Sequence, residues 1–385
     1  MTKGGVGRTG SRRIAIAAPH SRELVTDDLP LVKSLIADGH FVLCISPVVS
    51  ESDELALGQV GAKVAEIDIT ADKFALMPER QVAKRISMVL TQWNADTVLV
   101  HGNELIAPVA VAAKKSRLPR IIVVQAGMSE TGDEVKDVKK PGTEKFIKAF
   151  DAATAILCTN YDHAAQLEDS GLLREGLSPI VLPWSGVDLK SVEISPLPAV
   201  GRGLSVLMVS ELSRSHGALA FCEAAAIVRE RSPLTTFHIA GHAGRAEDAL
   251  TAADLARYAD AVTYLGDGAD LGELIARCHV FAYPSWAGTS PGPAIEAMAM
   301  GRPLIVADAP GCRELVDERV NGCLCRAGDA RSLADAIESY LKRPDLIPSM
   351  ARASRQKAER RYDRRLVMAA LFDVLEIERA KAGAV

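Results

Sequence analysis

Three things are scarce in this sequence of 385 residues: aromatic side chains, charge of one sign and long apolar runs. Phe, Trp and Tyr together make up 4%, which leaves few rings on which single-stranded nucleic acid could stack. The 45 Lys and Arg residues are matched by 49 Asp and Glu residues, so we expect no nucleic-acid partner. No apolar run approaches the roughly 18 residues that a membrane-spanning helix needs.

Cysteine pairing motifs and metal-ligand clusters are absent as well. His238 and His242 flank Gly241, but no third ligand follows at metal spacing, so no metal site is expected. The amino-terminus has no apolar signal core, and we expect a cytoplasmic protein with reduced thiols. The sequence has seven cysteines, an odd number, and no two of them form a Cys-x-x-Cys motif. They are Cys44, Cys158, Cys222, Cys278, Cys312, Cys323 and Cys325.

What the sequence does have is ample material for a core. The hydrophobic fraction is 48% and the mean hydropathy is +0.10, which is typical of a soluble globular protein of two or three domains. Residues 1–11 are Gly-rich and basic. They match Gly-x-Gly-x-x-Gly formally, but no strand precedes them as a dinucleotide loop requires. We therefore predict a flexible tail.

Residues 12–185 alternate short β-rich runs with helical segments. Strands separated by helices need crossover connections, which predicts a parallel sheet covered on both faces. We expect strands at 13–18, 41–46, 63–67, 97–101, 120–124, 155–159 and 180–182, and helices at 29–37, 77–93, 104–115 and 161–168.

A stretch rich in Pro and Gly, residues 183–203, predicts an inter-domain linker. The alternation then restarts, so the fold class is α/β with two Rossmann-like, doubly wound domains, residues 12–185 and 186–365. Ligands of such folds bind at the carboxyl ends of the strands, which predicts a central cleft. In the second domain we expect strands at 204–210, 235–240, 261–265, 280–283, 303–306 and 322–325, and helices at 216–230, 248–258, 271–278, 293–300 and 330–341, followed by two helices within 346–382.

The most specific pattern lies in the second half. Its pieces are the run from Tyr283 through Glu296 to Pro303, the run from Asp308 to Glu314, Asn321-Gly322, Tyr264-Leu265-Gly266, Asp270-Leu271 and Gly186-Val187-Asp188. In this order and spacing they resemble the nucleotide-sugar half of the family 4 glycosyltransferases, which have the GT-B fold. The nearest branch builds bacterial surface polysaccharides on polyprenyl carriers.

The resemblance implies a site and a reaction. The donor diphosphate would lie against the helix that begins near Pro291, where free amides and the helix dipole favour anions. A basic pair would neutralise the leaving phosphate without a metal or other cofactor. Glu296 matches the Glu that accepts hydrogen bonds from the ribose. The sugar would pass, usually with retention, to an acceptor on the first domain, to which a helix at 366–385 would return.

Several family positions are altered. Gly288 stands where a second Glu would hold the sugar, Glu211 and His216 stand at the basic pair, and Ala126 stands at a His of the first domain. A carboxylate beside a diphosphate is repulsive, and each lost contact to developing charge costs ~2.7–4 kcal/mol. Arg214 and His216 are the candidates to replace part of this charge.

The donor-side candidates each have an ordinary structural interpretation too. Glu296 could be a helix-surface residue, Arg214 a solvated loop residue and His216 the polar start of a helix. The loop before Pro291 could simply connect a strand to a helix. The donor-binding candidates are Leu265, Gly266, Arg214, His216, Gly217, Gly288, Thr289, Ser290, Pro291, Gly292 and Glu296.

On the acceptor side the candidates are Gln125, Asn103 and Glu104. Gln125 could substitute for the missing His beside it, or be an ordinary strand-end residue. Asn103 and Glu104 could face the acceptor, or be a helix cap with its first-turn acid. Residues 136–150 are basic with interspersed apolar side chains, which fits either an anionic membrane surface or a solvated loop and helix.

The sequence therefore favours a hexosyl- or acetylhexosaminyl-transferase that uses a nucleotide-sugar. Its acceptor would be a saccharide or a polyprenyl-linked saccharide, met in the cytoplasm or at the inner face of the membrane as a peripheral protein. The altered positions support an alternative. In it, the chain is a catalytically degenerate GT-B protein that binds a glycan, a nucleotide or a partner transferase without turnover.

Overall fold

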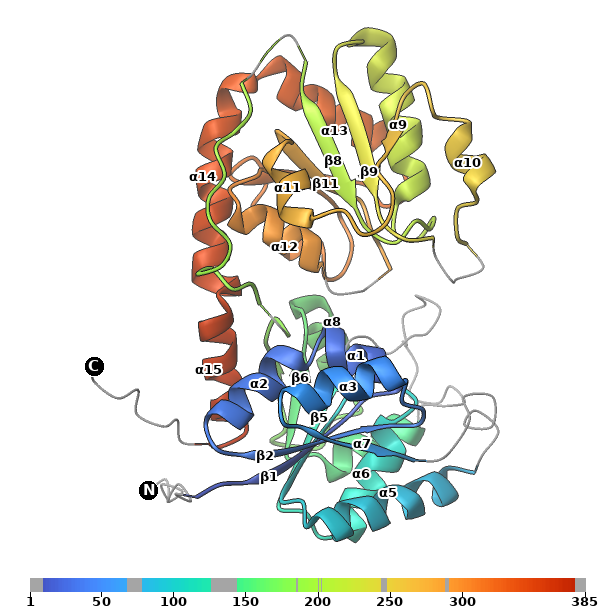
Figure 1. Ribbon diagram of the computed structural model, residues 1–385, viewed down its shortest axis with the longest axis vertical. Helices are drawn as coiled ribbons and strands as arrows, with labels where there is room; N and C mark the ends of the chain where they lie inside the picture. The colour runs from blue at the N-terminus through green and yellow to red at the C-terminus, as the bar shows by residue number, and fades with distance from the viewer. Residues whose placement is uncertain are drawn as a thin grey trace, which may run out of the picture. The chain divides into compact units, whose positions relative to one another are not determined.

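The fold is that of a computed structural model of the chain (Figure 1). The structure describes residues 10–67, 78–125, 144–184, 186–199, 201, 203–243, 248–287 and 291–377, and the side chains of residues 125, 144 and 145 are not among the parts described. Contacts divide the chain into two compact units, which are treated one at a time. Unit 1 is Met1–Ser185 with Leu366–Val385, and unit 2 is Gly186–Arg365.

Unit 1 is built on a parallel sheet of seven strands in the order β3-β2-β1-β4-β5-β6-β7. The order reverses between β1 and β4, which is the point where open α/β sheets bind ligands. The strands are β1 Arg13–Ala17, β2 Phe41–Ser46, β3 Lys63–Glu66, β4 Thr97–Val100, β5 Arg120–Gln125, β6 Ala155–Cys158 and β7 Pro179–Val181.

Helices cover both faces of this sheet (Figure 1). Alternate residues of β1 belong to different apolar clusters, with Ala15 on the side of α5, α6 and α7 and Ile14 on the side of α2 and α15. This alternation explains why the strands read as continuous apolar runs. The helices are α1 Ser21–Thr26, α2 Leu29–Ala37, α3 Glu51–Gln59, α5 Glu79–Trp93, α6 Ile106–Lys115, α7 Glu144–Ala152 and α8 Tyr161–Asp169.

The last helix of the described chain, α15 (Arg364–Val374), packs on unit 1. Val367, Met368, Leu371 and Phe372 form its buried stripe, the spacing expected for one apolar face of a helix. The Arg12 guanidinium donates hydrogen bonds to the carbonyl groups of residues 375 and 376, at 3.3 and 2.8 Å. The C-terminal helix is therefore fastened beside the first strand of unit 1.

Unit 2 repeats the design with a parallel sheet of six strands in the order β10-β9-β8-β11-β12-β13. The strands are β8 Ser205–Val209, β9 Thr236–Ala240, β10 Thr263–Tyr264, β11 Val280–Tyr283, β12 Leu304–Ala307 and β13 Gly322–Cys325. The helices are α9 Ala218–Arg231, α10 Ala252–Ala256, α11 Leu271–Ala276, α12 Gly292–Ala299, α13 Ala330–Lys342 and α14 Ile347–Lys357, with short helical turns η1 Arg313–Leu315, η2 Pro344–Leu346 and η3 Ala358–Tyr362.

These sheets confirm the predicted pair of Rossmann-like α/β domains, and the element boundaries differ from prediction for local reasons. Helix α1 has six residues, too few to show a periodicity, and α3 buries little besides Leu57. The helix predicted at 248–258 is shorter, because a capping box between Thr251 and Asp254 starts it at residue 252. The break predicted in the C-terminal helices is the π-helical turn η3.

All seven cysteines are free and buried. Burial raises the pKa of the Cys158 and Cys222 thiols to about 12, so they stay protonated and pack as small apolar groups. Thiols in this state are unsuited to nucleophilic chemistry.

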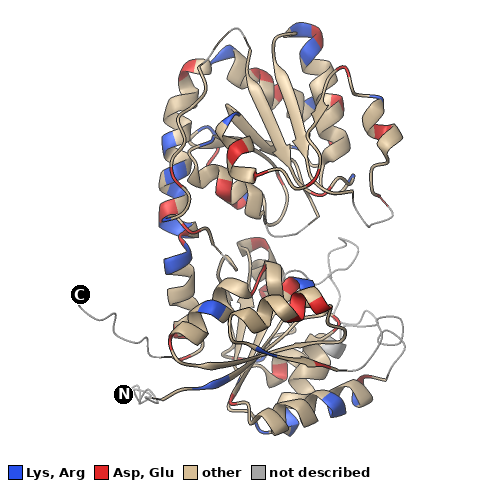
Figure 2. Cartoon of the chain, in the orientation of Figure 1, with Lys and Arg blue, Asp and Glu red and all other residues tan. Residues whose placement is uncertain are grey.

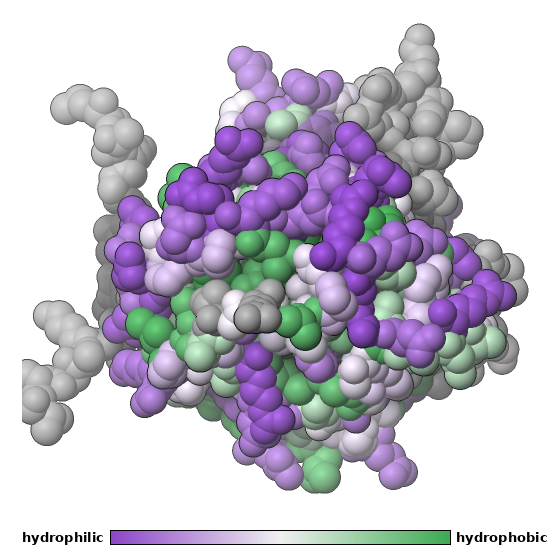
Figure 3. Space-filling view, turned by 90° about the horizontal axis from the view of Figure 1, so that it is seen from above, coloured by the Kyte–Doolittle hydropathy of each residue, from purple (hydrophilic) through white to green (hydrophobic). Residues whose placement is uncertain are grey.

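Charged residues are unevenly distributed on the helices. Figure 2 shows basic residues along α14, while the first turn of α3 holds the acidic residues Glu51, Asp53 and Glu54. The face in Figure 3 is mostly hydrophilic around a centre in which apolar side chains are exposed. Among the residues that the structure describes, no helix is both long enough and apolar enough to cross a bilayer. Residues 1–9 of the predicted tail and residues 136–143 of the basic stretch lie outside the described residues. Phe146 and Phe150 of that stretch are buried in the core of unit 1, so these two apolar side chains are not available to a membrane surface.

Candidate functional site

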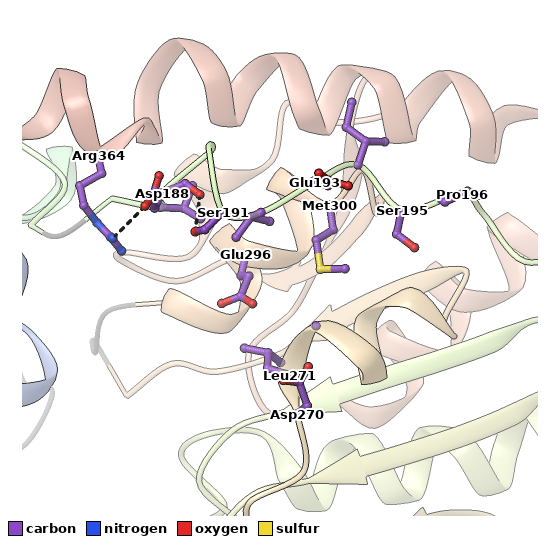
Figure 4. A pocket seen from close by; sticks show the side chains of 14 residues that line it. Asp188, Ser191, Glu193, Ser195, Pro196, Asp270, Leu271, Glu296, Met300 and Arg364 are labelled. Atoms are coloured by element: carbon purple, nitrogen blue, oxygen red, sulfur yellow. Dashed lines mark hydrogen bonds and ion pairs between the residues drawn. The ribbon is translucent and has the colours of Figure 1, made fainter.

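A pocket of about 780 Å³ in unit 2 lies beside α12 (Figure 4). One wall is the segment from Val187 to Pro196, which lies within the predicted linker, residues 183–203. The opposite wall is made by the start of α11 and by two residues of α12, Glu296 and Met300. Arg364 closes one end. Polar groups dominate this lining, which suits a ligand rich in hydroxyl or charged groups.

Glu296 is the predicted donor-side residue that lines this pocket. It is half-buried in the second turn of α12, and its carboxylate has no hydrogen-bond partner among the described residues. Burial raises the pKa of Glu296, nearby Asp270 raises it further, and Arg364 opposes both. A carboxylate held in this way can accept hydrogen bonds from the hydroxyl groups of a ligand.

Two arginines hold the pocket walls in place. Arg302 is fully buried and its guanidinium donates to six backbone carbonyl groups at 2.8–3.2 Å. Those of Ser195 and Pro196 belong to one wall, and the rest to the ends of α11 and α12. Arg355 donates to the carbonyl groups of Val192 and Ala299 at 3.0 and 2.7 Å. The two arginine side chains therefore join the backbone of one pocket wall to the backbone of the other.

The loop from β8 to α9 carries three further candidates, Arg214, His216 and Gly217. Gly217 has φ +83° and precedes α9, and a Cβ atom there would lie 2.4 Å from the carbonyl oxygen of Pro284. Only glycine fits both the left-handed backbone and this approach. His216 is held by Ser213, whose hydroxyl lies 2.8 Å from His216 Nδ1 and accepts from its backbone N–H.

The electrostatics of this loop are mixed. Burial lowers the pKa of His216, while Glu211 and Asp248 act in the opposite direction. Glu211 lies 3.7 Å from the His242 ring. Arg214 is exposed, and its backbone N–H donates to the carbonyl of Asp248. The two predicted phosphate contacts thus share one loop, and Glu211 is already partnered by a histidine.

Leu265 and Gly266 follow β10 and join its end to the neighbouring strands. The N–H of Leu265 donates to the carbonyl of Ile239, and the carbonyl of Gly266 accepts from the N–H of Gly241 at 3.0 Å. A Cβ atom on Gly241 would lie 1.8 Å from the carbonyl oxygen of Ser210. The ends of β8, β9 and β10 are therefore packed backbone against backbone, but Leu265 and Gly266 do not line the described part of the pocket.

Pro291 is the N-cap of α12 and Gly292 its first residue, as the family pattern requires. Pro293 follows, so one N–H that could bind an anion is missing from this helix start. Gly288, Thr289 and Ser290, the rest of the predicted donor loop, lie outside the described residues.

The acceptor-side candidates lie at the ends of two adjacent strands of unit 1. Gln125 is the last residue of β5 and pairs with Cys158 of β6, and its side chain is not among those described. Asn103 and Glu104 lie in the turn after β4. The helix that follows begins at Ile106 with Leu105 as its N-cap, so the expected helix start at residue 104, with these residues as cap and first-turn acid, is wrong.

The structure also shows a polar network that sequence reasoning did not assemble. Asp28 is fully buried and accepts from Trp184 Nε1 at 2.9 Å, and its other oxygen lies 2.7 Å from His101 Nε2. Glu23 lies 3.6 Å from His101 Nδ1. Burial lowers the pKa of His101, but Asp28, Glu23 and Asp27 outweigh it and raise that pKa. His101 is thus a structural ion-pair residue at this sheet edge.

Known proteins share both the sequence pattern and the fold. A family model described as glycosyl transferases group 1 matches residues 203–343. An N,N'-diacetylbacillosaminyl-diphospho-undecaprenol alpha-1,3-N-acetylgalactosaminyltransferase of Campylobacter jejuni is 24% identical over 297 residues, covering 73% of this chain and 77% of that protein. A putative colanic acid biosynthesis glycosyltransferase of Escherichia coli, WcaL, is 24% identical over 300 residues, covering 75% and 72%.

Solved structures extend the likeness to nearly the full chain. Anabaena HepE in complex with UDP aligns with a TM-score of 0.76 at 18% identity, covering 94% of this chain and 99% of that one. A glycosyltransferase of Rickettsia africae aligns with the same TM-score at 15% identity, covering 95% and 99%. The chain therefore has the GT-B fold, and its second unit matches the group 1 glycosyl transferases. Its sequence relatives include glycosyltransferases of bacterial surface-polysaccharide biosynthesis, in agreement with the resemblance found in its sequence.

Proposed function

We propose that this protein transfers a sugar from a nucleotide-sugar donor to a growing bacterial surface polysaccharide. The observation that carries the proposal is the pocket beside α12, whose wall from α11 and α12 lies within the matched family region and presents the Glu296 carboxylate to a ligand. In this proposal Glu296 accepts hydrogen bonds from the donor ribose. The diphosphate lies toward the start of α12, at Pro291 and Gly292, where the helix dipole favours anions.

The leaving diphosphate needs positive charge or hydrogen-bond donors. His216 and Arg214 supply part of this charge and some of these donors, and Gly217 lets the backbone at the start of α9 come close to the diphosphate. We propose that transfer needs no metal ion and retains the anomeric configuration, with the diphosphate stabilised by protein groups alone. Leu265 and Gly266 contribute backbone groups on the nucleoside side.

The acceptor is proposed to be a saccharide on a polyprenyl carrier. The Campylobacter jejuni relative is named for an undecaprenol-linked acceptor and for transfer of an acetylhexosamine, which supports an acceptor and a sugar of these classes. Gln125, Asn103 and Glu104 are the proposed acceptor contacts on unit 1. A lipid-linked acceptor would bring the protein to the inner membrane surface as a peripheral protein.

The first test is a thermal-shift screen with UDP, GDP, ADP, TDP and their common sugar conjugates, followed by calorimetry. A ligand present at one hundred times its dissociation constant adds ~2.7 kcal/mol of stability, which gives a clear shift. A response to one base supports the donor site and selects the donor for transfer assays, in which NMR of the product reports the anomeric configuration. No response to any nucleotide at millimolar concentration contradicts the proposal.

A second candidate function is binding without turnover. Glu211 at the position of a basic residue favours it, since a carboxylate there repels a diphosphate. Restoring the family residues with Gly288→Glu, Glu211→Arg and His216→Lys should then create donor hydrolysis or transfer. If the restored variant gains no nucleotide affinity, these three positions do not explain a loss of activity.

A further inference from the structure

Three arginines border the pocket of unit 2, and they differ in how their side chains are used. Arg302 and Arg355 are occupied by backbone carbonyl groups of the walls. Arg364 is fixed by its backbone instead. Its N–H donates to the carbonyl of Val187 at 2.9 Å, and the N–H of Val187 donates to the carbonyl of residue 362 at 2.7 Å. Backbone hydrogen bonds therefore hold Arg364 in place, and its guanidinium group remains available to a ligand.

The Arg364 guanidinium has unused hydrogen-bonding capacity. Its nearest acidic oxygen belongs to Asp188, 4.0 Å from Nη1, which is beyond hydrogen-bond distance. Its Nε is buried and has no partner among the described residues. Buried donors in native proteins are nearly always paired, so an unpaired one needs an explanation. A ligand group that accepts hydrogen bonds would provide it.

Charge narrows the class of ligand group. The described lining of the pocket has four carboxylates and one basic side chain, Arg364; the carboxylates are Asp188, Glu193, Asp270 and Glu296. Arg364 and Glu296 lie on the same side of the pocket, with Ser195 and Pro196 toward the other (Figure 4). Arg364 is the one positively charged side chain in the described lining that can meet an anion, and its planar guanidinium matches phosphate oxygens.

We propose that Arg364 binds a phosphate group of the nucleotide donor and replaces part of the charge missing at Glu211 and His216. The inference rests on the proposed function. Glu296 stands four residues beyond Gly292, about 6 Å along the helix axis. A nucleotide with its ribose at Glu296 therefore has its phosphates within a turn of the helix start, on the side where Arg364 extends.

The test compares three ligands that differ only in phosphate. Calorimetry with UDP, UMP and uridine is run on the wild type, Arg364→Ala and Arg364→Lys. Loss of a charge-assisted contact should weaken UDP and UMP by about ten- to a hundred-fold, while uridine affinity stays the same. The Lys variant should recover part of the loss, since it keeps the charge without the planar fork.

The matched control is Arg360→Ala. It removes the same charge four residues earlier, where the side chain is exposed and, among the described residues, donates to the carbonyl of residue 356. This control should leave all three affinities unchanged. Asp188→Asn should keep or increase UDP affinity, because a carboxylate that competes for Arg364 is removed.

Each other outcome has one meaning. Equal weakening of UDP and uridine, or no change in either, overturns the role of Arg364 while leaving the donor site intact. A loss of UDP affinity in Asp188→Asn equal to that in Arg364→Ala would make the pair a wall contact and overturn the inference. If the wild type binds a nucleotide with another base, the diphosphate, monophosphate and nucleoside of that base replace UDP, UMP and uridine. If it binds no nucleotide, the proposed function fails and the inference fails with it.

Discussion

Each unit carries an acid near a basic side chain at the carboxyl edge of its sheet, and the two are built in opposite ways. In unit 1, Asp28 is fully buried and both of its oxygens are occupied, by the His101 ring and the Trp184 indole. In unit 2, Glu296 is half-buried without a hydrogen bond among the described residues, and Arg364 retains an unpaired Nε. The first group is closed on itself, and the second is open to a pocket.

The difference indicates what each pair is for. A saturated buried network rigidifies its surroundings and is costly to break. An unsaturated polar site costs stability in the free protein, and that cost is recovered only when a ligand completes it. This contrast between a closed network and an open site leads to three predictions, and the failure of any one would contradict it.

The largest effect is expected for Asp28→Ala. It leaves the His101 ring and the Trp184 N–H buried without their acceptor, which should lower the free energy of unfolding of unit 1 by about 3–5 kcal/mol. Urea unfolding followed by circular dichroism measures this. Asp27→Ala, which removes a neighbouring carboxylate, should cost much less. Nucleotide binding by unit 2 should persist in Asp28→Ala, and its loss in a folded variant would refute a purely structural role.

Glu296→Ala should show the opposite behaviour. Nucleotide affinity and turnover should fall together by about ten- to a hundred-fold, the range for a hydrogen bond to a charged group. Stability should be unchanged or improved, because burial raises the pKa of Glu296 and the free protein gains nothing from its charge. Glu273→Ala, at an exposed position of α11, is the control. Unchanged affinity in Glu296→Ala would mean that the donor site lies elsewhere.

The smallest effect is a pH dependence in unit 1. The pKa of His101 is raised in the folded protein by Asp28, Glu23 and Asp27 against burial. Its contribution to stability is therefore complete below the ordinary value of 6.5 and is lost as the pH rises through the raised value. The stability difference between the wild type and His101→Gln should shrink with rising pH. Glu23 also faces His101, and His20 in turn acts on Glu23. Glu23→Gln should therefore reduce the effect, and a difference that grows with pH would contradict it.

Local patterns predicted most of the fold. The bounds predicted for β2, β11, β13 and α2 are those of the structure, since continuous apolar runs and a Gly stop depend on neighbours in the sequence. Short or weakly amphipathic helices such as α1 and α3 were missed, because they bury too few side chains to leave a pattern. Glu296 and Asp270 could be found because they belong to a family motif of fixed spacing.

The sequence by itself determined the two parallel α/β units, the resemblance to glycosyltransferases and the place of Glu296 beside a pocket wall. Only the tertiary structure decided that Asp28, His101 and Trp184 form one network. It also decided that Arg302 donates hydrogen bonds to backbone carbonyl groups of the pocket walls, whereas Arg364 keeps an Nε that is unpaired among the described residues. These roles depend on hydrogen bonds between residues up to 156 positions apart, as for Asp28 and Trp184. No periodicity or spacing in a chain encodes such a pairing, and whether a polar group is satisfied is settled only when the elements pack.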